Sequence, residues 1–233
     1  MRQIVSAAAG LWLCLGMSAI AEGRQGVVVE LYTSQGCSSC PPADENLAAL
    51  VDAPGVIALA LHVDYWDYIG WSDTFADPKF TKRQKGYANA AGSKMIYTPQ
   101  IIVNGRDRVE GNQAAKVAKA VSRGLGVDSP VTLIIDRDGD TVIIRAVANP
   151  PLSQGTRIQV VRYINASTVQ IERGENAGKS ITYRNIVTSW MDVGGWQGDQ
   201  PLETSATASG DAPVVVIIQS EGFGEILAAA EID

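Results

Sequence analysis

The chain has 233 residues, of which 19 are basic, 25 are acidic and one is histidine, so its formal net charge is −6 at pH 7. No cluster of lysines and arginines could follow a phosphate backbone, which excludes nucleic acid as an expected partner. The length suits one large domain or two small ones.

The first 21 residues have the pattern of a secretory signal peptide. Arg2 is followed by an uncharged apolar stretch, residues 4–20, and then by the small-residue cleavage site Ala19-Ile20-Ala21. A membrane anchor is the alternative, but a run of about seventeen residues is at the short limit for a span. We expect cleavage after Ala21, a periplasmic or secreted protein without a membrane span, and a net charge of −7 once Arg2 is removed from the −6 total.

Removal of this segment also removes Cys14 and leaves two cysteines, Cys37 and Cys40, in the stretch QGCSSCPP. In an oxidising exported compartment such a pair can persist as a disulfide. The C-x-x-C pair is therefore the first candidate for chemistry.

A strand, a helix and a second strand surround this pair. Residues 26–33, GVVVELYT, form a β-branched apolar run that predicts a buried strand. Residues 42–51 place Leu47, Leu50 and Val51 on one helical face, and residues 56–63 form another apolar run. This order predicts a parallel β-α-β crossover unit.

The next segment, residues 64–91, is polar and rich in aromatic residues, and its second half is weakly helical. Two short strands then flank Asn104-Gly105, a strong signal for a two-residue hairpin turn. A helix with Asn112 as its cap follows and ends at Gly124.

After Gly126 the sequence changes to short apolar strands separated by Gly, Asp and Asn. Helical periodicity is confined to a short stretch near Arg184 to Met191. These features predict a smaller, mostly antiparallel β-sandwich domain over residues 127–233.

The stretches ELYTSQGCSSCPPAD, HVDYWDYIGW and TPQIIVNG resemble a family of secreted, thioredoxin-like bacterial proteins catalogued as a domain of unknown function. The resemblance extends over most of the chain beyond the signal peptide. It implies an α/β fold class, with a thioredoxin-like domain over residues 22–126 followed by the β-sandwich domain.

The resemblance also implies an exported thiol–disulfide oxidoreductase that acts on protein thiols or disulfides and needs no cofactor. Cys37, at a helix start, would be the exposed nucleophile, because the helix N-terminus stabilises a thiolate, and Cys40 would be the buried resolving cysteine. Pro99 would be cis and would pack against the disulfide. The backbone at Thr98 would then bind an extended substrate by strand addition.

A structural staple is the alternative for the pair. Linking positions this close is worth roughly 2 kcal/mol, against about 4.7 kcal/mol for a hundred-residue loop, so redox exchange is favoured. A non-catalytic module that binds peptides or copper(I), with a structural disulfide, stays open as the second function. Metal binding would use Cys37, Cys40 and His62, although we expect no metal because the resemblance places a hindering proline at the pair.

Glu30 and three aromatic residues complete the candidate site. Thioredoxins carry a buried proton-relay aspartate six residues before the first cysteine, a position that Leu31 occupies here. Glu30 is one residue away and so points to the other face, which leaves a relay role or an arginine partner open. Tyr65, Trp66 and Trp71 form either a substrate-binding lip beside Cys37 or a small satellite core.

Overall fold

The structure is a computed structural model that describes residues 23–233, so the expected signal peptide lies outside the described residues. The helices are α1 (Pro41–Ala48), α2 (Pro78–Ala90) and α3 (Ala114–Leu125), with one 3₁₀ turn, η1 (Asp67–Ile69). The strands are β1 (Arg24–Gln25), β2 (Val27–Thr33), β3 (Val56–His62), β4 (Gln100–Val103), β5 (Asp107–Glu110), β6 (Val131–Asp138), β7 (Thr141–Ala148), β8 (Thr156–Gln170), β9 (Ser180–Trp196), β10 (Leu202–Thr207), β11 (Val214–Ser220) and β12 (Ile226–Ile232). No helix within residues 23–233 is long and apolar enough to cross a membrane.

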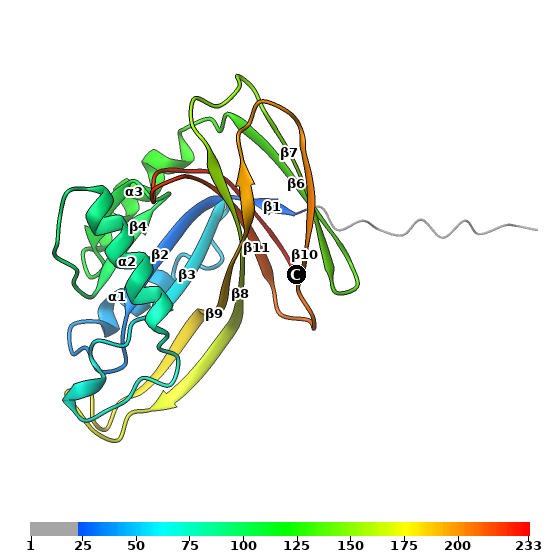
Figure 1. Cartoon of the computed structure of the whole chain (residues 1–233). Helices are drawn as coiled ribbons and strands as arrows, with labels where there is room; N and C mark the ends of the chain where they lie inside the picture. The colour runs from blue at the N-terminus through cyan, green and yellow to red at the C-terminus, as the bar shows by residue number, and fades with distance from the viewer. Residues whose placement is uncertain (1–22) are drawn as a thin grey trace, which may run out of the picture.

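Most of the strands belong to one mixed sheet. Its nine strands have the order β1-β12-β11-β8-β9-β3-β2-β4-β5, and a separate sheet has the order β10-β7-β6. β2 runs parallel to β3 and antiparallel to β4, and β3 runs parallel to β9. Figure 1 shows the helices on one side of the molecule and the three-stranded sheet on the other.

Three apolar cores separate these layers. The first lies between β2 to β4 and the helices α1 and α3, and includes Leu31, Leu47 and Val117. The second lies on the opposite face of β2 and β3, where α2 contributes Phe80 and the strands β8, β9 and β11 also take part. The third fills the space between the three-stranded sheet and the strands β8, β11 and β12. Alternate residues of β2 therefore enter different cores, as strand geometry requires.

The predicted fold class, a thioredoxin-like α/β domain followed by a β-sandwich domain, is wrong. The strands β8, β9, β11 and β12 do not form a sandwich of their own but extend the sheet that contains β2 and β3. The physical reason is that β3 would otherwise present an unpaired edge, which β9 covers. An apolar strand such as VVVIIQS has the same sequence pattern in either arrangement.

The local elements predicted in the first half are present, although α1 ends at Ala48, before Leu50 and Val51. The β2-α1-β3 crossover and the β4-β5 hairpin are present, and the hairpin turn has φ of 47° at Asn104 and 69° at Gly105. Positive φ at both central residues is what a type I′ turn requires. The helix cap is displaced by one residue, because Gln113 and not Asn112 is the N-cap of α3.

The helical stretch predicted near Arg184 to Met191 is wrong, because these residues belong to β9. Pairing with β8 along almost its whole length overrides the local pattern, and Asn185 adopts a positive φ of 46° within the strand. The resulting β8-β9 hairpin is long, and its end loop, residues 171–179, lies beside the segment that carries η1 (Figure 1). We call residues 171–179 the hairpin tip.

Candidate functional site at the disulfide

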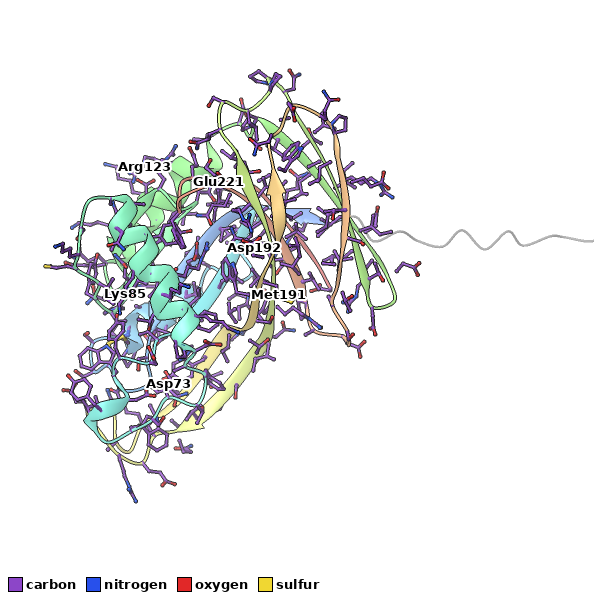
Figure 2. The ribbon with its side chains drawn as sticks, viewed as in Figure 1. Asp73, Lys85, Arg123, Met191, Asp192 and Glu221 are labelled. Carbon is purple, nitrogen blue, oxygen red and sulfur yellow. A yellow bond between two sulfur atoms is a disulfide. The ribbon has the colours of Figure 1, made fainter. Side chains whose placement is uncertain are left out.

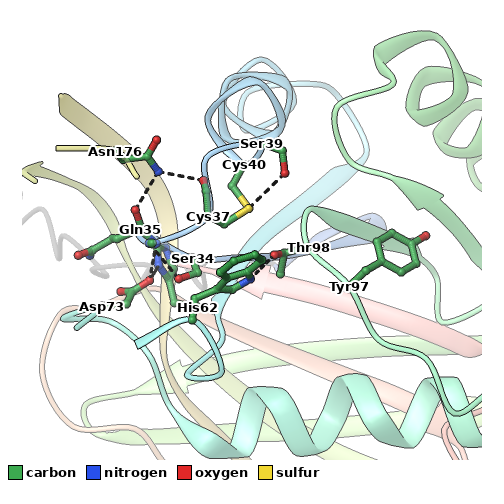
Figure 3. The surroundings of a disulfide bond; sticks show 12 residues. Ser34, Gln35, Cys37, Ser39, Cys40, His62, Asp73, Tyr97, Thr98 and Asn176 are labelled. Carbon is green, nitrogen blue, oxygen red and sulfur yellow. Dashed lines mark hydrogen bonds and ion pairs between the residues drawn. A yellow bond between two sulfur atoms is a disulfide. The ribbon is translucent and has the colours of Figure 1, made fainter. Parts of the chain in front are cut away.

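Cys37 and Cys40 form a disulfide with a Cα–Cα distance of 5.3 Å. A turn after β2 leads to Cys37, and Cys40 is the N-cap of α1 (Figure 3). Pro41 and Pro42 occupy the first helical turn, where their missing N–H groups cost no intrahelical bond. The motif therefore joins the carboxyl end of a central strand to the start of a helix.

Two expectations about Cys37 are wrong. The helix begins after Cys40, so Cys37 precedes the N-cap by three residues, and both cysteines are fully buried. The intervening Ser38 and Ser39 are exposed, and Ser39 Oγ lies 3.5 Å from Cys37 Sγ. Only the small loop between the sulfurs therefore faces the solvent.

The hairpin tip is one reason for this burial. The Asn176 side-chain amide donates to the backbone carbonyls of Gln35 and Cys37, each at 2.9 Å (Figure 3). Lys179 Nζ donates to Asn176 Oδ1 at 2.8 Å and holds the amide in this orientation. A segment distant in the sequence thus covers the C-x-x-C loop, and no local pattern in the sequence signals it.

The aromatic segment after β3 covers the loop from another side. Trp71 Nε1 donates to Gln35 Oε1 at 2.8 Å, and Trp66 Nε1 donates to Thr98 Oγ1 at 2.6 Å. Trp66 also packs against Gly36, where an added Cβ would lie 3.3 Å from Trp66 Cβ. Tyr65 and Trp66 are partly buried against the α2-side core, so they link this core to the disulfide loop.

The Thr98-Pro99 peptide bond is cis, as the resemblance implies, and Pro99 is buried. Thr98 and the exposed Tyr97 lie in the surroundings of the disulfide (Figure 3). Leu31, Ala43 and Pro99 converge on Gly111, where an added Cβ would lie 2.9 to 3.2 Å from their side chains. The proline therefore packs on the α1 face of β2.

Glu30 lies on the opposite face of β2 and is paired with an arginine, one of the two alternatives for this acid. Arg83 Nε donates to Glu30 Oε2 at 2.6 Å, and Arg83 Nη2 donates to Glu30 Oε1 at 3.0 Å. The hydroxyls of Tyr32 and Tyr87 also donate to Glu30, at 2.9 and 2.6 Å. Glu30 is thus part of a buried network under α2.

Sequence patterns missed a second buried cluster, at the carboxyl ends of β2 and β3. His62 Nδ1 lies 2.7 Å from Asp73 Oδ2, and both side chains are fully buried. Figure 2 places Asp73 at the same end of the molecule as the hairpin tip. The ring of Tyr183, from β9, packs edge-on against His62 with centroids 4.9 Å apart.

Asp44, four residues after Cys40, is the second acid of this cluster and is also buried. Burial raises the pKa of Asp44 to about 7, and His62 and the Thr33 hydroxyl oppose this rise. The spacing of Cys40 and Asp44 on one helix was the available signal for this residue, since positions i and i+4 share a face.

Cys37, Cys40 and His62 are not free to bind a metal ion in this structure. The two sulfurs are bonded to each other, and His62 Nδ1 is bonded to Asp73. Residues 23–233 contain no group of three or more His, Cys, Asp and Glu side chains placed to hold a metal ion.

No curated protein matches the chain. The structure of HBP35 of Porphyromonas gingivalis is similar in fold, with a TM-score of 0.60 and 14% identity over 90% of this chain and 75% of that chain. The crystal structure of protein AGR_C_4864 from Agrobacterium tumefaciens has a TM-score of 0.75 and 32% identity over 88% of this chain and 93% of that chain. Residues 28–219 match the family model described as "Protein of unknown function (DUF1223)", and the chain therefore belongs to the DUF1223 family.

Proposed function

We propose that the protein is an exported thiol–disulfide oxidoreductase that exchanges disulfides with protein partners through Cys37 and Cys40. The observation that carries this proposal is a disulfide between cysteines only three positions apart, placed where a strand meets the N-terminus of α1. Such a short loop stabilises the fold by only roughly 2 kcal/mol, so stability alone is a weak reason for the bond.

The surroundings of the two sulfurs favour a different role for each sulfur in the exchange reaction. Cys40 is at the N-cap of α1, where the helix dipole stabilises a thiolate and makes this sulfur a good leaving group. Cys37 would be the sulfur that a partner thiolate attacks, and the Ser39 hydroxyl is close enough to donate to a Cys37 thiolate. The location of C-x-x-C after β2, with Thr98-Pro99 before β4, supports a distant relation of this part to thioredoxins.

Exchange requires access, because both cysteines are buried. The hairpin tip is the element whose displacement would expose them, since it is bonded to the loop through the Asn176 amide. Two exposed tyrosines offer a partner protein a contact surface: Tyr97 in the surroundings of the disulfide, and Tyr68, whose neighbour Ile69 packs against Gly36. Partner binding and opening of the tip would therefore be coupled.

Trapping of partners tests the proposal. Cys40→Ala leaves an attacking Cys37 thiolate without an internal partner, so mixed disulfides should accumulate on exported protein in a non-reducing gel. Cys37→Ala should trap nothing, and the double variant is the control for unrelated adducts. A structural staple predicts instead that both single variants lose about 2 kcal/mol of stability and trap nothing.

A non-catalytic binding module is the second candidate, and complete burial of both cysteines favours it. The reduction potential separates the two functions. An exchanging pair should lie between roughly −270 and −120 mV, and an inert structural disulfide below about −300 mV. A value below −300 mV together with no trapped partner would support the binding module.

A further inference from the structure

Four buried polar atoms gather at the carboxyl ends of β2 and β3 without a hydrogen-bond partner in the protein. They are Thr33 Oγ1, His62 Nε2 and both carboxyl oxygens of Asp44, none of which makes a hydrogen bond of good geometry within residues 23–233, although the Thr33 hydroxyl lies close enough to Asp44 to lower its pKa. Buried polar groups are nearly always paired, because an unpaired one loses its hydration without compensation. Four such atoms next to a C-x-x-C motif therefore indicate that these residues have a catalytic role and do not serve to stabilise the fold.

Asp44 is the member of this cluster that lies on α1, four residues after Cys40. Its backbone N–H donates to the Cys40 carbonyl at 3.1 Å, so it lies one helical turn after this cysteine. Side chains of a helix tilt toward its N-terminus, which directs the Asp44 carboxyl group back over the turn that begins at Cys40. The side chain is more than nine-tenths buried, which keeps bulk water from replacing it as a proton source.

The titratable groups around Asp44 come from four elements. His62 ends β3, Asp73 lies in the segment before α2, Tyr183 is in β9, and Glu45 is the next residue of α1. Asp73 fixes the His62 ring through Nδ1, so that Nε2 is the nitrogen left free within the cluster. Asp73 also accepts from the Gln35 backbone N–H at 2.8 Å, which ties the cluster to the loop before Cys37.

We propose that Asp44 donates a proton to Cys40 when the disulfide is reduced and accepts it again when the pair is oxidised. His62 and Asp73 are positioning residues that act on this carboxyl group through their charges, His62 favouring its ionised form and Asp73 opposing it. The inference rests on the proposed function of the pair. A general acid is most effective when its pKa is near the working pH, and burial raises the pKa of Asp44 to about 7.

The reduction step balances as follows. A thiolate of a partner dithiol attacks Cys37 Sγ, the Cys37–Cys40 bond breaks, and Cys40 leaves with the electron pair and takes the proton from the Asp44 carboxyl group. The second thiolate of the partner then attacks the partner sulfur that is bonded to Cys37. This forms the partner's disulfide and releases Cys37 as a thiolate. Two electrons pass from the partner dithiol, which becomes a disulfide, to the cysteine pair.

Glu30, the acid that the sequence suggested, is unsuited to this role. Both of its oxygens accept hydrogen bonds from Arg83, and two tyrosine hydroxyls add further bonds. Each oxygen thus accepts two hydrogen bonds, which leaves neither oxygen free to bond a cysteine thiol. It also lies on the face of β2 covered by α2, away from the face that packs on α1.

The test is the rate at which dithiothreitol reduces the disulfide of the folded, oxidised protein between pH 5 and 9, corrected for the fraction of ionised dithiothreitol. In the wild type the corrected rate constant should fall as pH rises through about 7, because Asp44 loses its proton. Asp44→Asn should remove this fall and should be slower at pH 6 by about a hundredfold. Glu45→Gln, which changes the exposed neighbouring acid, should match the wild type.

Two further measurements keep the result unambiguous. Near-ultraviolet circular dichroism and thermal melting must show that Asp44→Asn is folded. His62→Gln keeps the carboxyl group but removes a group that lowers its pKa, so the fall in rate should move to higher pH. If Asp44→Asn reproduces the wild-type profile, the inference is wrong although the pair is reactive. If the wild-type disulfide resists reduction in the folded protein, the inference and the proposed function are both wrong.

Discussion

Two buried carboxylates, Glu30 and Asp44, lie in different regions of the molecule and have opposite surroundings. Glu30 has a bidentate arginine and two tyrosine hydroxyls. Within residues 23–233, neither side-chain oxygen of Asp44 makes a hydrogen bond of good geometry, and its polar neighbours are the Thr33 hydroxyl and His62. Burial of a charge is costly unless it is paired, so the donors around Glu30 compensate for its burial, whereas burial raises the pKa of the Asp44 carboxyl group to about 7. A buried acid near a reactive group is thus informative when it is unpaired.

The Glu30 network connects regions that are distant in the sequence. Arg83 of α2 also donates to Gln159 of β8 and Gln219 of β11, and it stacks on the Trp190 ring with its guanidinium carbon 3.8 Å from the ring centroid. These bonds join β2 to β8 and β11 through one guanidinium group. The network therefore stabilises the arrangement that the fold-class prediction missed.

The largest expected effect comes from breaking the buried ion pair between Glu30 and Arg83. Arg83→Met removes the cation and leaves Glu30 buried without compensation, which should lower the free energy of unfolding by about 3–5 kcal/mol in urea titrations. Reduction of the disulfide in protein that remains folded should be unchanged, since the Arg83 side chain packs on the face of β2 opposite to α1. The double variant Glu30→Leu with Arg83→Met removes both charges and should recover most of the loss. A loss below about 1 kcal/mol in the single variant would contradict a structural role for the pair.

Ionisation of Asp44, in contrast, should make the free energy of unfolding depend on pH. The pKa of Asp44 is raised from 3.8 to about 7 in the folded state. Folding therefore favours the protonated form, and stability falls as pH rises from about 4 to 7 and is level above, by up to about 4 kcal/mol. Urea unfolding of the oxidised protein at several pH values should show this slope. Asp44→Asn should lack it and Glu45→Gln should keep it, so parallel slopes for all three proteins would rule out the shifted pKa.

Local parts of the fold were accessible from the sequence because their signals are local. The apolar runs of β2 and β3, the prolines at the start of α1 and the Asn104-Gly105 turn each determine their structure within a few residues. The position of β9 is different. Its pairing with β3 involves Ala60 and Ile186, residues far apart in the chain, and a strand pattern does not specify which sheet it joins.

The candidate site divides in the same way. Cys37, Cys40 and Thr98-Pro99 form recognisable motifs, whereas an acid in a first helical turn, such as Asp44, is ordinarily an exposed residue that favours the helix dipole. Its burial results from the packing of α1 against β3 and β9. Asn176 lies in a loop rich in polar residues and is indistinguishable in sequence from an ordinary turn residue. Both roles depend on tertiary contacts that a local pattern does not contain.

The smallest expected effect comes from loosening the hairpin tip, which is bonded to the C-x-x-C loop beside Asp44. Asn176→Ala deletes two hydrogen bonds to the loop, to the carbonyls of Gln35 and Cys37, and should lower the free energy of unfolding by about 1–2 kcal/mol. The same loss favours the open tip, so dithiothreitol should reduce the disulfide roughly tenfold faster, because about 1.4 kcal/mol corresponds to a factor of ten.

Gln170→Ala is the matched control, since Gln170 belongs to the same hairpin and bonds Ser180 across it at an exposed position. This variant should leave the reduction rate unchanged. If Asn176→Ala loses stability while its disulfide is reduced no faster, the tip stabilises the loop but does not control access to the sulfurs. In that case opening must involve the aromatic segment instead, where Trp71 is bonded to Gln35.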